Sequence, residues 1–326
     1  MIPSRKRDRG LRVIGHQTTL RERLEFSGVG VHSGSPVTMA LVPADADTGI
    51  LFNVCDPRTG ETKDLPANLA TVGATDLCTV LGSPTGAHAA TIEHLMAALR
   101  ALNVDNVIVE LDAPEVPVMD GSSAVFVEAI HAVGLKALSA SRWYIRVNKP
   151  VRVDMGASWG EFIPYEGTRF EVEIDFDCEA IGRQRFASDI NEDVFCKELS
   201  RARTFGFMKD VERLWAAGFA LGSSLENSVV IGDDNAIINP EGLRYVDEFV
   251  RHKALDAIGD LALAGAPILG CYRSYRGGHK LNSMVLKELL SDASAFDFVQ
   301  PTRSRPKVMH GDLEAVSAPA YAAVFI

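Results

Sequence analysis

The sequence lacks paired cysteines. Its cysteine count is odd, at five, and no two cysteines stand at C-x-x-C spacing. Neither a disulfide framework nor a thiolate zinc cage is therefore indicated. The pattern instead favours isolated reduced thiols, as in proteins of the cytoplasm, at Cys55, Cys78, Cys178, Cys196 and Cys271.

Long hydrophobic runs and an excess of positive charge are also missing. No window approaches the roughly 18 consecutive apolar residues of a spanning helix, and no signal-peptide core follows the basic cluster at 5–7. The net charge is −10, whereas a domain that grips nucleic acid is usually basic. We therefore expect a cytoplasmic protein with no spanning membrane segment and no nucleic-acid partner. An anionic substrate would need a local basic pocket.

The length and the order of the patterns indicate two domains of similar construction. The chain has 326 residues, 47% of them hydrophobic, which suffices for two buried cores. A hairpin over 26–44 precedes further strands and two helices, at 51–54, 77–81, 91–102, 106–111 and 124–133. After a small polar stretch without periodicity at 137–141, the second half repeats this order, at 144–153, 170–176, 249–264, 268–272 and 283–290. We therefore expect an α+β fold with a domain boundary after residue 140.

The helix at 249–264 carries a metal-binding pattern. His252, Asp256 and Asp260 stand at i, i+4 and i+8, so an α-helix stacks them along one face. Ligands at i and i+4 can hold one metal ion, as the paired histidines of H-E-x-x-H do. An exposed face with a weak surface pair is the simpler alternative. The many apolar neighbours favour the metal, because a buried carboxylate without a partner is costly.

The helix at 91–102 supplies the complementary chemistry. Its apolar residues recur as on a core-facing helix, at Ile92, Leu95, Met96, Leu99 and Leu102. Glu93 directly precedes His94 on this helix. A hydrolytic zinc ion takes three protein ligands and a water, and a nearby carboxylate can accept that water's proton. A Glu-His pair alone is a weak signal, and its weight comes from the second helix.

The other histidines differ in what their surroundings indicate. His279 follows two glycines and could face the same cleft as a charged group, with Asp260 as the carboxylate that orients it. His131 suits a helix surface or cap, and His32 stays ambiguous after its turn. A solvated side chain is the expectation for His16, His88 and His310.

Five longer motifs follow one another along the chain. They are TIEHLMAAL at 91–99, EVPVMDGS at 115–122, SRARTFGF at 200–207, GLRYVDEFVRHKALDAIGDL at 242–261 and GGHKLN at 277–282. In this order they resemble the UDP-3-O-acyl-N-acetylglucosamine deacetylase family, zinc enzymes of the committed step of lipid A synthesis in Gram-negative bacteria. The resemblance covers 17–299, and it is specific because all five motifs occur together.

The resemblance implies a fold with the active site in a cleft between two domains. Each domain would be a two-layer α/β sandwich with a small insert, over 17–140 and 141–300. The first insert would be a small sheet, and the second a β-α-β unit at about 203–234. The tails at 1–16 and 301–326 would be flexible.

The resemblance also implies the roles of the site residues. One catalytic Zn²⁺, with Fe²⁺ as the alternative metal, would be held by His94, His252 and Asp256. Glu93 would be the general base. His279 would be the charged imidazole, with Asp260 as its supporting carboxylate, and the hydroxyl of Thr204 would bind the oxyanion. Phe205 would stack on the sugar, Lys253 would bind the diphosphate, and Cys78 would lie near the metal. Four of these residues have simpler alternatives: Thr204 as a turn hydroxyl, Phe205 as a core aromatic, Lys253 as a surface charge and Cys78 as a buried thiol.

Apolar residues of the second insert suit a passage for the acyl chain. They include Phe207, Met208 and Leu214, and their alternative role is to anchor the insert to its own domain. We expect a monomer that acts on a UDP-linked, acylated glucosamine and can associate transiently with a membrane surface. Two other functions stay open: a zinc amidase for another N-acetyl sugar, and a sugar-nucleotide binding protein with a structural metal.

Overall fold

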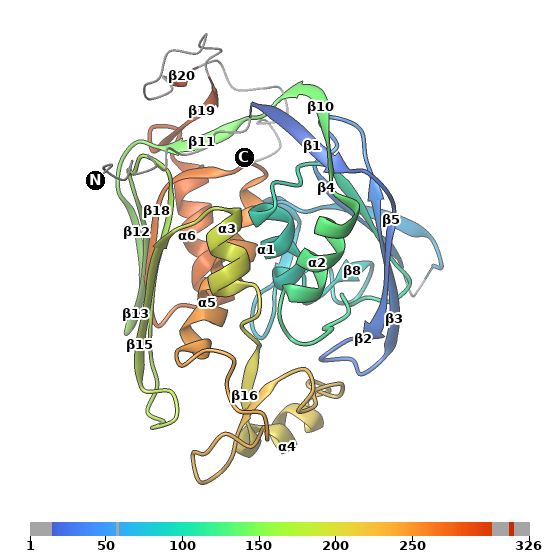
Figure 1. Cartoon of the computed structure of the whole chain (residues 1–326), viewed down its shortest axis with the longest axis vertical. Helices are drawn as coiled ribbons and strands as arrows, with labels where there is room; N and C mark the ends of the chain where they lie inside the picture. The colour runs from blue at the N-terminus through green and yellow to red at the C-terminus, as the bar shows by residue number, and fades with distance from the viewer. Residues whose placement is uncertain (1–14, 57–58, 302–312, 316–326) are drawn as a thin grey trace, which may run out of the picture.

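Two β-sheets form the outside of the molecule, and the helices lie between them (Figure 1). The computed structural model describes residues 15–56, 59–301 and 313–315. Each half of the chain builds one sheet with its helices, so the layers run sheet, helices, helices, sheet. The predicted α+β class with two similar layers is confirmed.

The first sheet has five strands and one face covered by helices. Its order is β2-β3-β9-β4-β5, with the bounds Leu24–Val29, Pro36–Pro43, Val107–Leu111, Ile50–Cys55 and Thr62–Pro66. Strands β2 and β3 are the predicted hairpin and pair antiparallel. Buried and half-buried residues alternate along β9, because one face of this central strand packs on the helices. Those helices are α1 (Glu93–Ala101) and α2 (Ala124–Val133).

A small antiparallel sheet precedes α1 and matches the first insert that the resemblance implied. Its strands are β6 (Val72–Ala74), β7 (Val80–Gly82) and β8 (His88–Ala89), and the 3₁₀ turn η1 (Leu69–Thr71) leads into it. The chain between β6 and β7 contains Cys78 and Thr79. This insert therefore carries both residues toward the start of α1, where Ile92 N–H donates to the carbonyl oxygen of Thr79.

The stretch at 137–141 is part of a strand, which the sequence did not predict. Strand β10 (Leu135–Ser141) pairs antiparallel with β1 (His16–Leu20), which lies far from it in sequence. Most positions of β10 are exposed or half-buried in an irregular order, so no apolar period marks the strand. The chain leaves the first layer just after β10. The domain limits at 140 and 141 stay a prediction.

The second sheet is larger and has mixed strand directions. Its path is β12-β13-β18-β11-β19-β20, and β14 pairs with both β18 and β15. Along this path the bounds are Val151–Met155 (β12), Ser158–Ile163 (β13), Ile268–Tyr275 (β18), Tyr144–Val147 (β11), Phe296–Pro301 (β19) and Leu313–Ala315 (β20). Strands β14 and β15 span Thr168–Asp175 and Arg183–Asp189. The single strand predicted at 144–153 is two strands, separated by a turn that contains Pro150, which has no backbone donor.

The helices of the second half carry much of its buried surface. They are α3 (Glu192–Val194) with the π-turn η2 (Phe195–Leu199), α5 (Glu248–Leu261) with the 3₁₀ turn η3 (Ala262–Ala264), and α6 (His279–Ser291). Helix α5 buries 12 of its 14 residues, as expected for a helix packed on several sides. Helix α6 begins four residues before the predicted start at 283, because the extended Gly278 serves as its N-cap.

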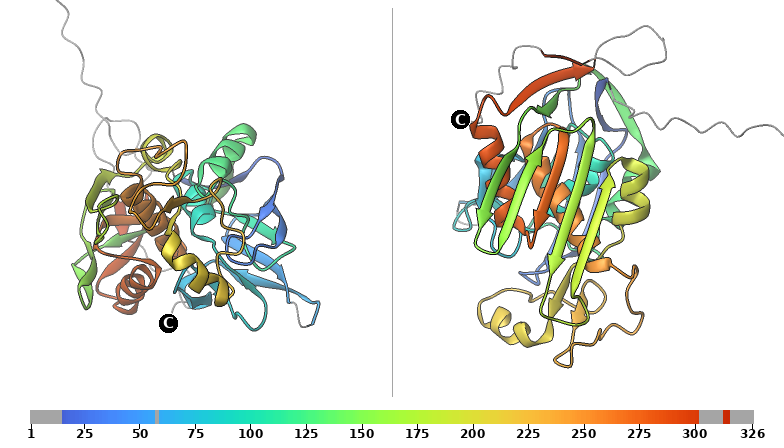
Figure 2. Two further views of the ribbon diagram at one scale, coloured as in Figure 1. Left: turned by 90° about the horizontal axis from the view of Figure 1, so that it is seen from below. Right: turned by 90° about the vertical axis from the view of Figure 1, so that its left-hand side faces the viewer.

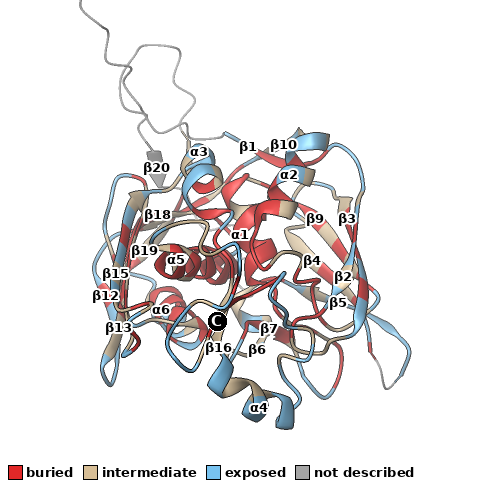
Figure 3. Ribbon diagram, turned by 60° about the horizontal axis from the view of Figure 1, so that its bottom comes forward, coloured by how far each residue is buried: buried red, intermediate tan, exposed pale blue. Residues whose placement is uncertain are grey.

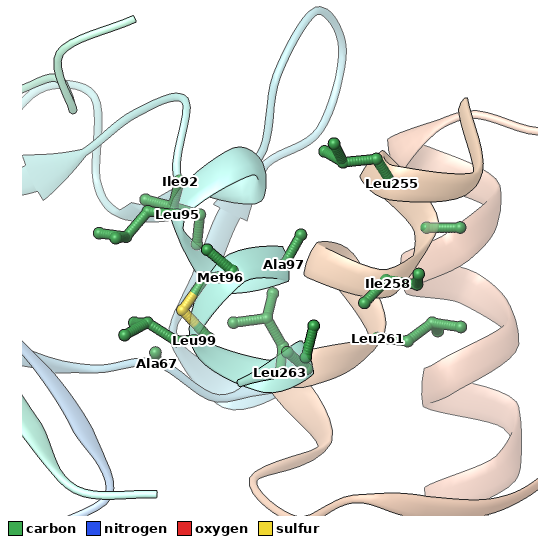
Figure 4. Packing of buried hydrophobic residues seen from close by; sticks show 14 of the residues in the cluster. Ala67, Ile92, Leu95, Met96, Ala97, Leu99, Leu255, Ile258, Leu261 and Leu263 are labelled. Atoms are coloured by element: carbon green, nitrogen blue, oxygen red, sulfur yellow. The ribbon is translucent and has the colours of Figure 1, made fainter. Parts of the chain in front are cut away.

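Helices α1 and α5 cross in the middle of the molecule and join the two halves. Figure 4 shows buried apolar side chains of both helices, among them Met96 and Leu99 of α1 and Ile258 of α5. Their backbones approach closely at Gly259. A methyl group there would lie 2.0 Å from the carbonyl oxygen of Glu93. The crossing therefore depends on a residue without a side chain.

The second insert projects from one end of the molecule (Figures 1 and 2). Strand β16 (Phe205–Phe207) pairs parallel with β17 (Val229–Ile231), and α4 (Met208–Ala216) connects them with a loop, which is the predicted β-α-β order. Helix α4 buries none of its residues, whereas α5 is almost entirely red in the burial view of Figure 3.

In the part of the chain that the structure describes, no helix is long and apolar enough to cross a membrane. The predicted tails at 1–16 and 301–326 lie outside the described residues, apart from 15, 16, 301 and strand β20. The expectation for His310 therefore lies outside them as well.

Candidate metal centre and active site

Three helices bring the predicted site residues together between the two halves. Helix α1 contributes Glu93 and His94 from its first turn, and α6 contributes His279 as its first residue. Helix α5 contributes its i, i+4 and i+8 residues from one face, namely His252, Asp256 and Asp260. All of these side chains are buried. Each buried charge therefore needs a partner.

His94, His252 and Asp256 converge on one point. Each offers one ligand atom, and these atoms all lie within 4.8 Å of one another. From Oδ1 of Asp256, Nε2 of His94 lies at 3.6 Å and Nε2 of His252 at 3.3 Å. This Oδ1 is buried and has no hydrogen-bond partner among the described residues. Two imidazoles beside such a carboxylate oxygen form a donor set that fits a divalent transition metal.

The protonation states of His252 and Asp256 suit metal binding, which requires neutral imidazoles and an ionised carboxylate. Burial lowers the pKa of His252 to about 3, so its ring is neutral at pH 7. Its Nδ1 lies 3.0 Å from the carbonyl oxygen of Ala202, an acceptor that keeps the proton on Nδ1 and leaves the lone pair on Nε2. Burial alone would raise the pKa of Asp256, but His252 and the Lys253 ammonium hold it well below its usual range.

Glu93 is a buried carboxylate beside the triad. Burial raises its pKa, and the imidazoles of His279 and His94 oppose this effect only in part. Its Oε2 accepts a hydrogen bond from the backbone N–H of Thr79 at 3.1 Å, and its Oε1 lies 3.8 Å from Nε2 of His279. A carboxylate with a raised pKa accepts protons more readily, which suits a general base.

His279 makes the contact with Asp260 that the sequence suggested. Its Nδ1 lies 2.9 Å from Oδ2 of Asp260. Burial disfavours the imidazolium, but the carboxylates of Asp260, Glu93 and Asp256 outweigh burial and raise the pKa of His279 to about 9. The positively charged form therefore predominates at pH 7, close to the triad.

Two residues that the sequence did not single out complete the polar cluster. Thr79 donates its hydroxyl to Oδ1 of Asp260 at 2.6 Å, and Asn282 donates its side-chain amide to Oδ2 at 2.8 Å. Asn282 stands at i+3 from His279 on α6, so helical spacing was a usable signal for it. Thr79 lies between two short strands, where no periodic pattern marks it.

Thr204 and Phe205 lie where the second insert begins. The ring of Phe205 packs edge-on against Phe249, with centroids 4.9 Å apart, and its centroid lies 6.2 Å from that of His252. Thr204 is half-buried, and its backbone N–H donates to the carbonyl oxygen of Gly121 at 2.8 Å. The structure thus brings Phe205 next to a triad residue. The contacts of both residues with the substrate stay predictions.

Lys253 bonds a triad residue, and Cys78 directly precedes Thr79 of the polar cluster. Nζ of Lys253 donates to Oδ2 of Asp256 at 2.7 Å, which leaves Oδ1 to face the two imidazoles. Its contact with a diphosphate stays a prediction. Burial, with the charge of Glu93 adding to it, raises the pKa of Cys78 to about 12. Its thiol is therefore protonated at pH 7 when no metal is bound.

The apolar residues of the second insert are unusually accessible. Phe207 and Leu214 are half-buried. Met208 is 42% exposed, Trp215 53% and Leu221 52%. Side chains that anchored the insert to its own domain would be covered, so this exposure argues against the anchoring alternative for these three.

The sequence of the chain is similar to proteins of known activity over most of its length. Residues 17–291 match the family model described as LpxC, UDP-3-O-acyl N-acetylglycosamine deacetylase. The UDP-3-O-acyl-N-acetylglucosamine deacetylases of Brucella ovis and Brucella canis are each 60% identical to it over 285 residues. This alignment covers 87% of the chain and 99% of each relative. The protein of that name from Brucella melitensis is 59% identical over the same length.

Proposed function

The chain belongs to the LpxC family of UDP-3-O-acyl N-acetylglycosamine deacetylases, and on this basis we propose that it hydrolyses the 2-acetamido group of UDP-3-O-acyl-N-acetylglucosamine. The products are UDP-3-O-acyl-glucosamine and acetate, in the committed step of lipid A synthesis. One observation carries the proposal. The unpartnered Oδ1 of Asp256 faces two imidazoles, with the buried carboxylate of Glu93 beside them.

The triad fits a single zinc ion, with Fe²⁺ as the alternative. His94, His252 and Asp256 supply two nitrogens and one oxygen, which is the ligand number of a catalytic zinc site. Zinc bound there would supply Lewis acidity, which polarises the amide carbonyl and lowers the pKa of a water molecule. Among the described residues, the convergent ligand group consists of His94, His252 and Asp256 and does not include Cys78.

The residues around the triad divide the proton transfers between them. Glu93 is the general base that accepts the proton of the attacking water, since its buried carboxylate has a raised pKa. The His279 imidazolium stabilises the developing oxyanion or protonates the leaving amine, and Asp260 holds that ring. The hydroxyl of Thr204 adds a further donor for the oxyanion.

Substrate recognition would involve the second insert and the start of α5. Phe205 packs on the sugar ring, and Lys253 meets the nucleotide diphosphate. Apolar side chains of the insert line the passage for the acyl chain, including the exposed Met208 and the half-buried Phe207 and Leu214. The exposure of Met208 supports this role, because an apolar surface left open to water is stabilised when a hydrocarbon chain covers it.

Acetate release from UDP-3-O-acyl-N-acetylglucosamine tests the proposal. We expect turnover that disappears after chelation and returns on addition of Zn²⁺. The same sugar nucleotide without the 3-O-acyl chain should react much more slowly, because the apolar side chains of the insert would then have no acyl chain to contact. Turnover that survives complete metal removal, or equal turnover of the two substrates, would contradict the metal or the acyl-chain part of the proposal respectively.

A further inference from the structure

Thr79 connects two carboxylates that come from different halves of the molecule. Its backbone N–H donates to Oε2 of Glu93 on α1 at 3.1 Å. Its hydroxyl donates to Oδ1 of Asp260 on α5 at 2.6 Å. Thr79 itself is 2% exposed, so water cannot take over either bond without a rearrangement. One residue of the small first insert thus contacts both the general base Glu93 and the carboxylate that supports His279.

We propose that Thr79 is a positioning residue that couples the general base Glu93 to the Asp260–His279 pair. This proposal rests on the proposed function, because the two groups are given their roles by the deacetylation reaction. Among the described residues, Thr79 makes no hydrogen bond to a triad residue. It acts through the two carboxylates to which it donates.

The bonds of Asp260 show why the hydroxyl matters. Oδ2 accepts from Nδ1 of His279 at 2.9 Å and from Nδ2 of Asn282 at 2.8 Å. Among the described residues, Thr79 is the one donor to Oδ1. With donors on both oxygens the plane of the carboxylate is fixed, and so is the ring of His279. Without the hydroxyl, Oδ1 would be a buried acceptor with no partner, and rotation of the carboxylate would carry the imidazole with it.

The two bonds that Thr79 donates come from different parts of the residue. The main-chain bond to Glu93 does not depend on the side chain at position 79, whereas the bond to Asp260 requires a hydroxyl. A substitution can therefore remove the link to Asp260 and leave the link to Glu93 intact. This separation makes the proposal testable with one side chain.

The test compares Thr79→Val with Thr79→Ser in the metal-loaded, full-length protein. Valine keeps the shape and the backbone N–H but removes the hydroxyl, and serine keeps the hydroxyl. We expect Thr79→Val to lower kcat by about 10- to 100-fold, as the loss of supporting contacts in metal sites does, with KM changed less than about twofold. Thr79→Ser should keep most of the kcat of the unsubstituted protein, because serine supplies the same hydroxyl. The control is Thr168→Val, which removes a hydroxyl bonded to the carbonyl oxygen of Ile268 at 2.7 Å, far from these groups in the second sheet.

A double-mutant cycle distinguishes positioning from a general structural defect. If Thr79 acts through Asp260, adding Thr79→Val to Asp260→Asn should lower kcat by less than about twofold further, because the two changes remove the same support. Losses that multiply, or a Thr79→Val enzyme within twofold of the unsubstituted kcat, would overturn the proposal.

A second measurement does not require turnover. In histidine-labelled protein, the Nδ1 proton of His279 bonded to Asp260 should give a downfield, slowly exchanging resonance, assigned by its loss in His279→Ala. We expect Thr79→Val to shift it and speed its exchange, while Thr168→Val leaves it unchanged. An unaltered resonance in Thr79→Val would refute the positioning role. Absence of acetate release from the unsubstituted protein would instead refute the proposed function, and the resonance would still decide the role of Thr79.

Discussion

A methyl group at Gly259 should separate the two helices that build the site. Gly259 lies on α5, and a Cβ there would be 2.0 Å from the carbonyl oxygen and 2.8 Å from the carbonyl carbon of Glu93, where ordinary contact begins at 3.4 Å. The backbones of α1 and α5 must therefore part by about 1.4 Å to accept alanine, the difference between 3.4 and 2.0 Å. Neither atom belongs to a flexible side chain that could move aside.

The expected cost of Gly259→Ala has two opposing terms. Alanine favours a helix over glycine by about 1 kcal/mol, which would stabilise the protein at an unhindered position. Overpacking a core costs about 1–3 kcal/mol, and a backbone clash belongs at the upper end of that range. We expect the free energy of unfolding to fall by about 2 kcal/mol. We also expect kcat to fall about 100-fold, because a displacement of about 1 Å has that effect on reacting groups.

Urea unfolding followed by circular dichroism measures the first effect, and acetate release measures the second. Gly259→Ser should be worse than Gly259→Ala, because it adds one more atom at the same place. Gly15→Ala is the control, since a Cβ at Gly15 meets nothing within 4 Å. If Gly259→Ala is as stable and active as the unsubstituted protein, the close crossing of the helices is not what positions Glu93.

Three further predictions concern the base and acid, the insert and the thiols. Glu93→Ala and His279→Ala should each lower turnover by at least about 100-fold, as expected for acid–base groups, while metal analysis shows full zinc occupancy. Trp215→Ser should raise KM for the acylated substrate without changing the denaturation midpoint, because this side chain is 53% exposed and contributes little to the core. Iodoacetamide at pH 8 should modify the exposed Cys55 first and spare Cys78, whose thiolate fraction is about one in 10,000 when burial has raised its pKa to about 12. Mass spectrometry would reveal the order, and the rate at Cys78 should rise about tenfold per pH unit.

The parts of the fold that the sequence predicted are those with a strong local period. The apolar residues of α1 and α5 recur at helical spacing, and the spacing of His252 and Asp256 placed them on one face before any partner helix was known. The start of α6 was predicted four residues late, because two glycines before His279 read as a loop. In the structure Gly278 caps the helix and His279 is its first residue.

The parts that the sequence did not predict depend on residues that are distant along the chain. Strand β10 exists because it pairs with β1, more than 100 residues earlier, and its own residues show no regular alternation. Thr79 lies between two strands of a small three-stranded sheet and bonds a residue 181 positions later. Such contacts are set by the packing of the two halves, which no local pattern records.

The site is a property of the interface between the two halves and not of either half alone. Glu93 and His94 come from α1, while His252 and Asp256 come from α5, so the distances from His94 to the two other triad residues join the two helices. The buried charges there are mutually paired, with the exception of Oδ1 of Asp256 among the described residues. Burying this oxygen without a partner costs free energy, so a cation that binds it would stabilise the folded chain. Metal binding and the docking of the two halves should therefore stabilise each other, because both depend on the same helix crossing.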